Sequence, residues 1–351
     1  MFHGDDGPSH NKVSSVLLSW YASNKRVLPW RDPQGLPTDP YRVWISEIML
    51  QQTTVPTVRG YFERFISRWP SVQDLAKASL DDVLHEWQGL GYYSRAKNLH
   101  KCAVMIVEAF DGTFPTAEKD LLSLPGVGPY TAAAIQSIAF NSPSTVVDGN
   151  VERVIARLFS LKTPLPQAKA EIHKLAGHIR SEEEPSNYAQ ALMDLGSSVC
   201  TPKAPKCVIC PLEKFCSAKK HNPESFPIRQ KKKEKPTRRG IFYFIQDDKG
   251  RVLLEKRPLS GGLFSGLMAL PSEGWDTTDD DPVTRLKIKN IKPLPEKVRH
   301  VFTHFSLIAE VRYAESTIAE GVWVFPEALS NYALPTLMKK IFKLTLPETV
   351  E

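Results

Sequence analysis

The chain has 351 residues, 42% of them hydrophobic, which is enough for two ordinary domains with separate cores. Four of its five cysteines lie between positions 200 and 216, a usage that suits a reducing compartment and excludes a disulfide scaffold. No apolar run approaches the roughly 18 residues needed to span a bilayer. We therefore expect a soluble cytoplasmic protein with no membrane partner.

The net charge of +6 is unevenly distributed. Through Arg239 the chain has 31 Lys and Arg against 24 Asp and Glu, and the remainder has 14 against 15. A basic first part suggests an anionic polymer as its partner, although ordinary solubility charge explains the same imbalance.

Apolar residues recur at helical spacing in most stretches up to about position 223, which predicts an all-α domain over 1–223. The predicted helices cover 13–21, 43–50, 58–66, 96–110, 132–140, 151–158 and 188–199. A basic, proline-containing stretch at 224–239 predicts a solvated, mobile linker. From Gly240 the pattern changes to a strand, a turn and a second strand over 241–257. Further strands are predicted near 266–271, 300–307 and 322–325, with a last helix at 336–344, so 240–351 is expected to be an α+β domain.

Glu47 is the first acidic residue with chemical promise, because it lies among apolar residues in YRVWISEIMLQQT. Such a glutamate either lies on a solvated face or is a carboxyl group in an apolar pocket with a raised pKa. In the second case Glu47 stays protonated and can donate a proton.

A glycine-containing turn lies in the stretch 117–140, where two short helices flank Gly126 and Gly128. Glycines let backbone N–H groups approach an anion closely, and the next helix adds the positive end of its dipole. The stretch is typical of a helix-hairpin-helix motif that binds a DNA phosphate without reading sequence. A plain packing unit of two helices is the alternative.

Asp148 directly precedes an amphipathic helix in TVVDGNVERVIARLF, where Asp is a favoured N-cap. The N–H groups and the dipole of the helix favour the ionised carboxylate, which can stabilise a developing cation. A protonated Glu47 and an anionic Asp148 would divide the work of glycosidic cleavage between them.

The four clustered cysteines, Cys200, Cys207, Cys210 and Cys216, follow the pattern C-x6-C-x2-C-x5-C. Four thiolates so close in sequence can hold one 4Fe–4S cluster, and tetrahedral zinc is the main competitor. The uneven spacing lacks the paired CxxC hooks of a zinc ribbon, which favours the iron–sulfur cluster.

Several of these segments together resemble one family, the MutY adenine DNA glycosylases of the helix-hairpin-helix superfamily. The resemblance rests on LPWRDP, VWISEIMLQQT, GLGYYSRAKNLH, LPGVGPYTAAAI, VVDGNVERV, ALMDLGSSVC and the cysteine loop. From Gly240 onward the chain is similar to the MutT (Nudix)-like domain of that family, with GLFSGLMALP and HVFTHFSL as the best matches.

The resemblance implies a DNA repair enzyme that flips adenine out of a mispair with 8-oxoguanine, or with guanine, and hydrolyses its glycosidic bond. It implies that Glu47 is the general acid that protonates adenine N7, and that Asp148 stabilises the sugar cation. Tyr130 and Asn150 would support this pair. The residues implied to form the adenine pocket are Trp30, Arg31, Leu50 and Gln190. Those implied to insert into the duplex are Gln52, Leu90 and Tyr92.

Tyr130 decides between two types of chemistry. Endonuclease III-like glycosylases for oxidised pyrimidines resemble this domain but have a lysine at this position, whose amine forms a Schiff base and leads to strand cleavage. A phenol cannot do so, and we predict base removal without efficient strand cleavage. A DNA-binding or redox-sensing protein without enzymatic activity is the third possibility.

The second domain lacks the glutamate-rich run that MutT-like pyrophosphohydrolases use to bind magnesium, so we do not expect that activity. The aspartates of PSEGWDTTDDDPVTRL are expected in a solvated loop. The resemblance implies that this domain recognises 8-oxoguanine through Phe302, Thr303 and His304. Many relatives have Ser at the middle position. The expected partner is double-stranded DNA with a mispaired adenine, bound by a monomer near the nucleoid.

Overall fold

The computed structural model describes residues 10–32, 38–230, 234–259, 262–276, 281–316 and 320–346. The chain divides into two compact units, unit 1 with Met1–Lys77 and Lys101–Lys232, and unit 2 with Ala78–His100 and Lys233–Glu351. Residues 78–100 therefore group with the C-terminal fold, although the sequence predicted them in the helical domain. The domain boundaries at 223 and 240 stay a prediction.

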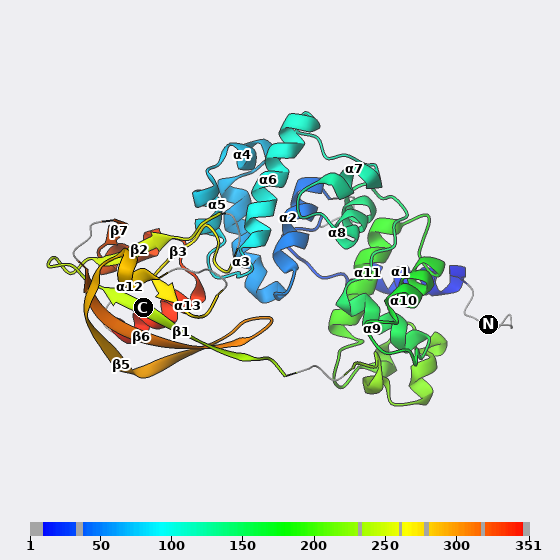
Figure 1. The fold of residues 1–351 in the computed structure, drawn as a ribbon. Helices are drawn as coiled ribbons and strands as arrows, with labels where there is room; N and C mark the ends of the chain where they lie inside the picture. Colours follow the sequence, from blue (N-terminus) through cyan, green and yellow to red (C-terminus); the bar gives the residue numbers. More distant parts are fainter. Residues whose placement is uncertain are drawn as a thin grey trace. The chain divides into compact units, whose positions relative to one another are not determined.

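Unit 1 is helical, as predicted, and Figure 1 shows its helices in blue to green. Apolar periodicity missed the short or weakly apolar helices α4, α5 and α10, whereas α7 is the first of the two short helices predicted around the glycine turn. The helices up to residue 198 are α1 (His10–Asn24), α2 (Pro40–Leu50), α3 (Val55–Arg68), α4 (Val72–Lys77), α5 (Leu80–Glu86), α6 (Ser94–Ala109), α7 (Glu118–Ser123), α8 (Pro129–Ala134), a π-helical turn (Ile135–Ala139), α9 (Gly149–Leu158), α10 (Lys169–His178) and α11 (Pro185–Ser198). Of these, α5 and the start of α6 belong to unit 2.

Helix α11 packs against α9, α1 and the π-helical turn. Gly196 makes the contact with α9 possible, because a Cβ atom at this position would lie 2.6 Å from Cβ of Asn150. A side chain there would push the two helices apart. Short 3₁₀ turns follow α11 at Cys207–Ile209, Glu213–Phe215, Ser217–Lys220 and Pro223–Ser225.

Unit 2 contains two small sheets. In the four-stranded sheet, β1 (Thr237–Ile245) lies between β4 (Ser272–Glu273) and β6 (Ser306–Ser316), and β5 (Ile288–Val301) pairs with the other edge of β6. In the three-stranded sheet, β2 (Val252–Lys256) lies between β3 (Met268–Ala269) and β7 (Val322–Val324). The remaining elements are α12 (Pro282–Arg285), a 3₁₀ turn (Pro326–Asn331) and α13 (Thr336–Thr345).

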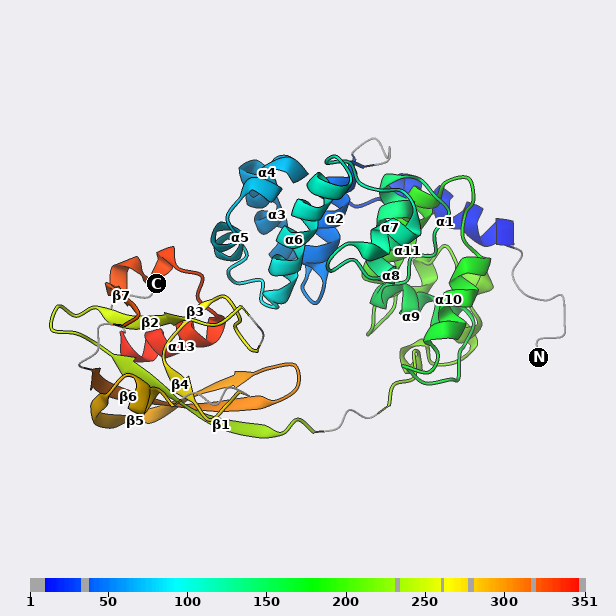
Figure 2. The same ribbon diagram turned by 45° about the horizontal axis from the view of Figure 1, so that its top comes forward.

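The second half of strand β1 is buried on both faces, which explains the apolar run of residues 241–245. Phe242 and Phe244 point into a core shared with β2, β6 and α13, and Figure 2 shows α13 beside both sheets. Tyr243 and Ile245 point to the opposite face, into a smaller cluster with Leu286. The α+β prediction for this part is confirmed.

The predicted strand, turn and second strand over 241–257 are confirmed as β1, the Asp247–Gly250 turn and β2, although the two strands belong to different sheets. Two other predictions for this part of the chain differ from the structure in detail. Strand β5 was missed before position 300, since its Lys- and Pro-containing sequence lies on a largely exposed edge strand. The linker at 224–239 is partly ordered: the carbonyl of Phe226 accepts from Arg157 Nε, and residue 237 starts β1. Residues 231–233 of that stretch lie outside the described residues.

The predicted solvated loop of aspartates is wrong for Asp276, whose buried carboxylate pairs with Arg257. Asp281 caps α12 by accepting from the N–H groups of Val283 and Thr284. The aspartates at 279 and 280 lie outside the described residues. In the ranges that the structure describes, no helix is both long enough and apolar enough to cross a membrane.

Candidate active site

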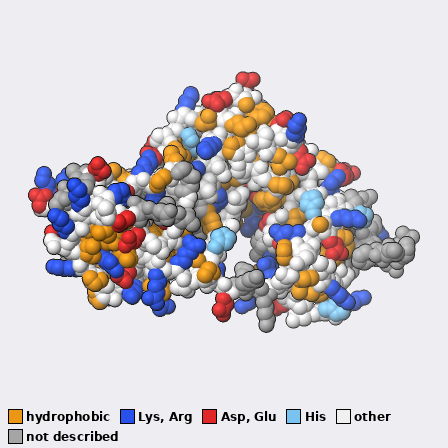
Figure 3. Space-filling model, viewed as in Figure 1, with side chains coloured by type: hydrophobic (Ala, Val, Ile, Leu, Met, Phe, Trp, Pro, Cys, Tyr) orange, Lys and Arg blue, Asp and Glu red, His pale blue; other side chains and the backbone are white. Residues whose placement is uncertain are grey.

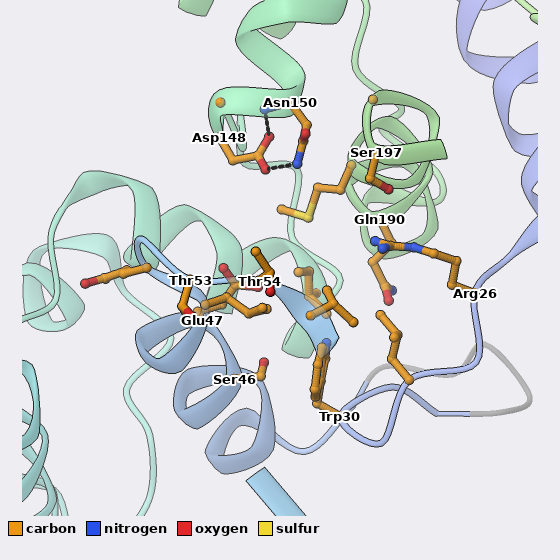
Figure 4. Close-up of a pocket in the computed structure, with 18 of the residues that line it drawn as sticks. Arg26, Trp30, Ser46, Glu47, Thr53, Thr54, Asp148, Asn150, Gln190 and Ser197 are labelled. Atoms are coloured by element: carbon orange, nitrogen blue, oxygen red, sulfur yellow. Dashed lines mark hydrogen bonds between the residues drawn. The ribbon is translucent and has the colours of Figure 1, made fainter. Parts of the chain in front are cut away.

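A cavity of about 620 Å³ in unit 1 collects all of the predicted catalytic and adenine-pocket residues, and its size lies in the range of ligand-binding pockets. Figure 4 shows Glu47 entering from α2, Asp148 and Asn150 from the start of α9, and Gln190 from α11. The predicted residues that line it are Trp30, Arg31, Glu47, Leu50, Gln52, Tyr130, Asp148, Asn150 and Gln190. These residues come from separate stretches of sequence.

Glu47 lies in apolar surroundings and not on a solvated face. Helix α2 starts at Pro40, directly after its N-cap Asp39, and nearly all of its residues from Tyr41 to Met49 are buried. Glu47 itself is only 6% exposed. Its Oε2 accepts a 2.5 Å hydrogen bond from the Tyr130 hydroxyl. Burial raises the pKa of Glu47 to about 7; the nearby Asp148 also raises it, whereas the Tyr130 hydrogen bond and Arg31 lower it.

Asp148 is the N-cap of α9, as its sequence position predicted. Its Oδ1 accepts from the N–H groups of Asn150 at 2.9 Å and Val151 at 2.7 Å, and its Oδ2 accepts from Asn150 Nδ2 at 2.8 Å (Figure 4). Burial nevertheless raises the pKa of Asp148 above its usual value, against these hydrogen bonds and the charge of Arg153. The expectation that the cap alone governs this carboxyl was therefore incomplete.

The two carboxyl groups differ in what stabilises their anions. Each carboxyl has an arginine nearby, Arg153 for Asp148 and Arg31 for Glu47, but Asp148 accepts three hydrogen bonds whereas Glu47 accepts one, from Tyr130. Hydrogen bonds to a carboxylate favour its charged form, so the hydrogen bonds favour the anion more strongly at Asp148 than at Glu47. The cavity can thus offer a proton donor and an anion to the same bound molecule.

The other walls of the cavity combine apolar and polar groups. Trp30 is 5% exposed and packs edge-on against Phe62, with ring centroids 5.4 Å apart. Gln190 is equally buried, and its Nε2 donates to the carbonyl of Ser186 at 3.2 Å. Gln190 therefore does not lie on a solvated helix face.

Arg26 lines the cavity and was missed by sequence reasoning, as was Asp194 behind it. Asp194 is completely buried and pairs with both Arg26 and Arg31. In the sequence, Asp194 resembles any polar residue of an amphipathic helix, because Arg26 and Arg31 lie more than 160 positions away. No local signal could have identified it.

Two of the predicted DNA-contacting residues have left-handed backbones, which side-chain-bearing residues adopt at a cost of about 1 kcal/mol or more. Gln52 has φ 62° and lies on the cavity, whereas Tyr92 has φ 48° and belongs to unit 2. Tyr92 is 46% exposed and is therefore not a core aromatic. Leu90 is only 6% exposed in the structure, and its insertion into a duplex stays a prediction.

The hairpin turn has one glycine that the backbone requires. Gly126 has φ 79°, in the region that favours glycine, whereas Gly128 is the N-cap of α8 with an extended backbone. The turn therefore leads directly into a helix N-terminus, as a phosphate-binding hairpin does.

The predicted recognition residues form the turn between β5 and β6. The N–H of Phe302 donates to the carbonyl of Phe305 at 2.8 Å, and the two rings stack with centroids 4.7 Å apart. Thr303 and His304 are exposed at the tip. The Thr303 and Tyr92 hydroxyls are hydrogen-bonded at 3.1 Å, which joins a predicted recognition residue to a predicted duplex-inserting residue.

The four cysteines that follow α11 line one small cavity together with Arg157. Arg157 donates to the Cys200 sulfur at 3.3 Å, and Arg153 donates to the Cys200 carbonyl at 2.7 Å. Among the described residues, no three His, Cys, Asp or Glu side chains are arranged around a single metal ion. Four thiols that line one cavity beside an arginine donor are nevertheless the type of ligand that an iron–sulfur cluster takes.

Known families match both parts of the chain. Residues 45–180 match the HhH-GPD superfamily of base excision DNA repair proteins, and residues 241–344 match the NUDIX domain. The chain is 34% identical to an adenine DNA glycosylase of Buchnera aphidicola, over 94% of this chain and 98% of that protein. It belongs to the adenine DNA glycosylase family. The human adenine DNA glycosylase is also 34% identical, over 93% of this chain and 73% of the human protein.

Solved structures agree with the fold of the helical part. A thermostable thymine-DNA glycosylase has a TM-score of 0.54 and 29% identity, covering 60% of this chain and 95% of its own. Endonuclease III in a non-covalent DNA complex has a TM-score of 0.50 and 25% identity, over 61% and 97%. This adenine DNA glycosylase family member is therefore a DNA-binding base excision repair enzyme. On the face of the molecule that Figure 3 shows, Lys and Arg side chains are interspersed with acidic ones.

Proposed function

We propose that the protein is a monofunctional DNA glycosylase that removes adenine mispaired with 8-oxoguanine, and also with guanine. The observation that carries the proposal is the placement of Glu47 and Asp148 on one cavity, in surroundings that give the two carboxyls different acidities. Adenine cannot be attacked inside a duplex, so it must be flipped into this cavity.

Glu47 starts the reaction by donating its proton to N7 of the flipped adenine. The glycosidic C–N bond then breaks, and its electron pair leaves with the neutral base. The Tyr130 hydroxyl occupies Oε2 of Glu47, which leaves the other carboxyl oxygen to face the base. A general acid with a pKa near 7 is well matched to neutral conditions.

Asp148 stabilises the oxocarbenium-like sugar that remains after the base has left. Asn150 fixes the carboxylate by donating to it from both its backbone and its side chain. Water adds to C1′ and loses a proton to a carboxylate, which completes hydrolysis. No lysine is found among the described residues that line the cavity, and Tyr130 has no amine for a Schiff base.

An assay on a panel of duplexes tests the proposed function. The panel holds adenine opposite 8-oxoguanine, adenine opposite guanine, thymine glycol, and normal pairs. We expect alkali-labile sites in the adenine strand of the two mispairs alone. Activity on thymine glycol, or as much borohydride-trapped enzyme as an endonuclease III control gives, would instead support the lyase alternative.

We also propose that Cys200, Cys207, Cys210 and Cys216 hold one 4Fe–4S cluster, with zinc as the alternative. The cluster would cross-link the loop that follows α11, next to the arginines that reach Cys200. Substituting Cys207→Ser should remove the iron and the visible absorbance and weaken DNA binding. The matched control is Cys102→Ala, a change in the core of α6 that should leave the iron content unchanged. Stoichiometric zinc and no iron in the wild type would contradict the cluster.

We further propose that the protein binds DNA as a monomer and that Thr303, His304 and Tyr92 contact 8-oxoguanine. That base differs from guanine by an N7–H donor and O8, and the Thr303 hydroxyl can accept from N7–H while bonded to Tyr92. Thr303→Val keeps the shape and removes the hydroxyl. It should lower the preference for 8-oxoguanine over guanine by about tenfold. Thr303→Ser is the control and should keep the preference, while an equal loss on both mispairs would contradict the contact.

A further inference from the structure

A buried ion pair lies behind the cavity, formed by one carboxylate and two guanidinium groups. Asp194, on α11, has no exposed side-chain surface. It accepts from Arg31 through two parallel hydrogen bonds of 2.7 and 3.0 Å. It also accepts from Arg26, at 2.6 Å from Nε and 3.1 Å from the backbone N–H. Both oxygens of Asp194 are therefore fully used by these two residues.

The two arginines face the same cavity as Glu47. The Arg31 side chain is 10% exposed, so its charge is poorly solvated, whereas the Arg26 side chain is 31% exposed. An unpaired cation in such a place seeks the nearest anion, and removing one partner of a buried pair leaves an uncompensated charge. Glu47 and Asp148 are the other carboxyl groups on the cavity wall among the described residues.

We propose that Asp194 is a positioning residue that holds Arg31 and Arg26 in its own ion pairs, so that neither guanidinium captures Glu47 and deprotonates it. The inference extends the proposed function, which requires a protonated Glu47. Asp194 does not touch the reacting atoms. It acts through the arginines, whose positive charge it both fixes and compensates.

The groups that face the two carboxyls are consistent with this role. Tyr130 from α8, Asp148 at the start of α9 and Arg31 act on Glu47, and of these Arg31 is the cation. Asp194 faces Arg26, Arg31 and the hydroxyl of Tyr21 on α1. On the α9 side, Arg153 donates to the side-chain oxygen of Asn150 and to three backbone carbonyls. The ion pairs of Arg31 and Arg26 with Asp194 thus determine whether a guanidinium group can approach Glu47.

The test is a direct titration of the Glu47 carboxyl in the full-length protein carrying ¹³C-labelled glutamate, with the signal assigned from Glu47→Gln. Asp194→Asn should lower the midpoint by about one pH unit or more, because the freed cations favour the anion. Asp194→Glu should restore most of the wild-type midpoint. The high-pH limb of adenine excision should move to lower pH by the same amount.

A purely structural role predicts an equal loss of excision at every pH and an unmoved midpoint, and that result would overturn the inference. Should Asp194→Asn fail to fold, Arg31→Gln decides the question, because removing the cation should raise the midpoint and an unchanged value refutes the proposal. The outcomes separate the two proposals. A wild type that excises no adenine contradicts the proposed function, whereas the titration still decides the role of Asp194.

Discussion

Substituting Glu47→Gln is expected to slow adenine excision by about 10²–10⁴-fold while DNA binding is retained, because the amide cannot supply the proton that a general acid gives. Single-turnover cleavage of an adenine opposite 8-oxoguanine measures the loss, and gel-shift titration measures binding. For the wild type the rate should fall as pH rises through about 7, where the buried carboxyl loses its proton. The matched control is Glu63→Gln on the exposed face of α3, which should leave the rate unchanged.

The same substitution should stabilise the fold at high pH. The pKa of Glu47 is raised from 4.5 to about 7, so its contribution to stability is complete below pH about 4.5 and is lost as pH rises through about 7. Glu47→Gln lacks this loss and should unfold with a free energy higher by on the order of 2 kcal/mol at pH 8. Denaturant unfolding at pH 4 and pH 8 checks the sign. The difference in free energy of unfolding between the variant and the wild type should be larger at pH 8 than at pH 4. An equal or smaller difference at pH 8 would mean that Glu47 ionises in the fold at little cost.

Substituting Asp148→Asn should lower the excision rate by about 10³-fold, because the carboxylate charge that stabilises the sugar cation is lost. The asparagine oxygen can still accept from the N–H groups at the start of α9, so the helix cap and the fold should survive. This variant therefore separates the catalytic charge from the capping role. Asp148→Ala should lose the rate and about 1 kcal/mol of stability as well.

The control for the second prediction is the same chemical change at another N-cap. Asp281→Asn, ahead of α12, replaces a carboxylate that caps a helix away from the cavity and should leave excision unchanged. Excision by Asp148→Asn at the wild-type rate would reduce Asp148 to a structural cap. The reaction would then have to proceed without an anion at the sugar.

Local patterns predicted what depends on neighbouring residues in the sequence. The N-cap at Asp148 and the turn at Gly126 are set within a few residues, so the amino-acid sequence is sufficient to place both. The state of Glu47 is different, since composition leaves a solvated face and an apolar pocket both open. Burial of Glu47 depends on α8 and the π-helical turn, which follow more than 80 positions later.

The features that the sequence did not predict depend on contacts between residues far apart in the chain. Asp194 and its arginines are a tertiary contact without a local pattern. Strand β5 pairs along β6 with two register shifts, which tolerates prolines and lysines that normally argue against a strand. The burial of Leu90 could not be foreseen either, because it depends on how residues 78–100 pack in unit 2.

The chain passes between its two units three times, after Lys77, after His100 and after Lys232. Residues 78–100 contact the C-terminal part of unit 2 through polar groups. The His85 ring is hydrogen-bonded to the Ser330 carbonyl, and Lys97 donates to the Ser265 hydroxyl. Truncation near residue 233 would therefore strip partners from a segment that remains in the shortened protein. Such a fragment is a damaged enzyme rather than an isolated domain, and activity lost on truncation cannot be attributed to lesion recognition alone.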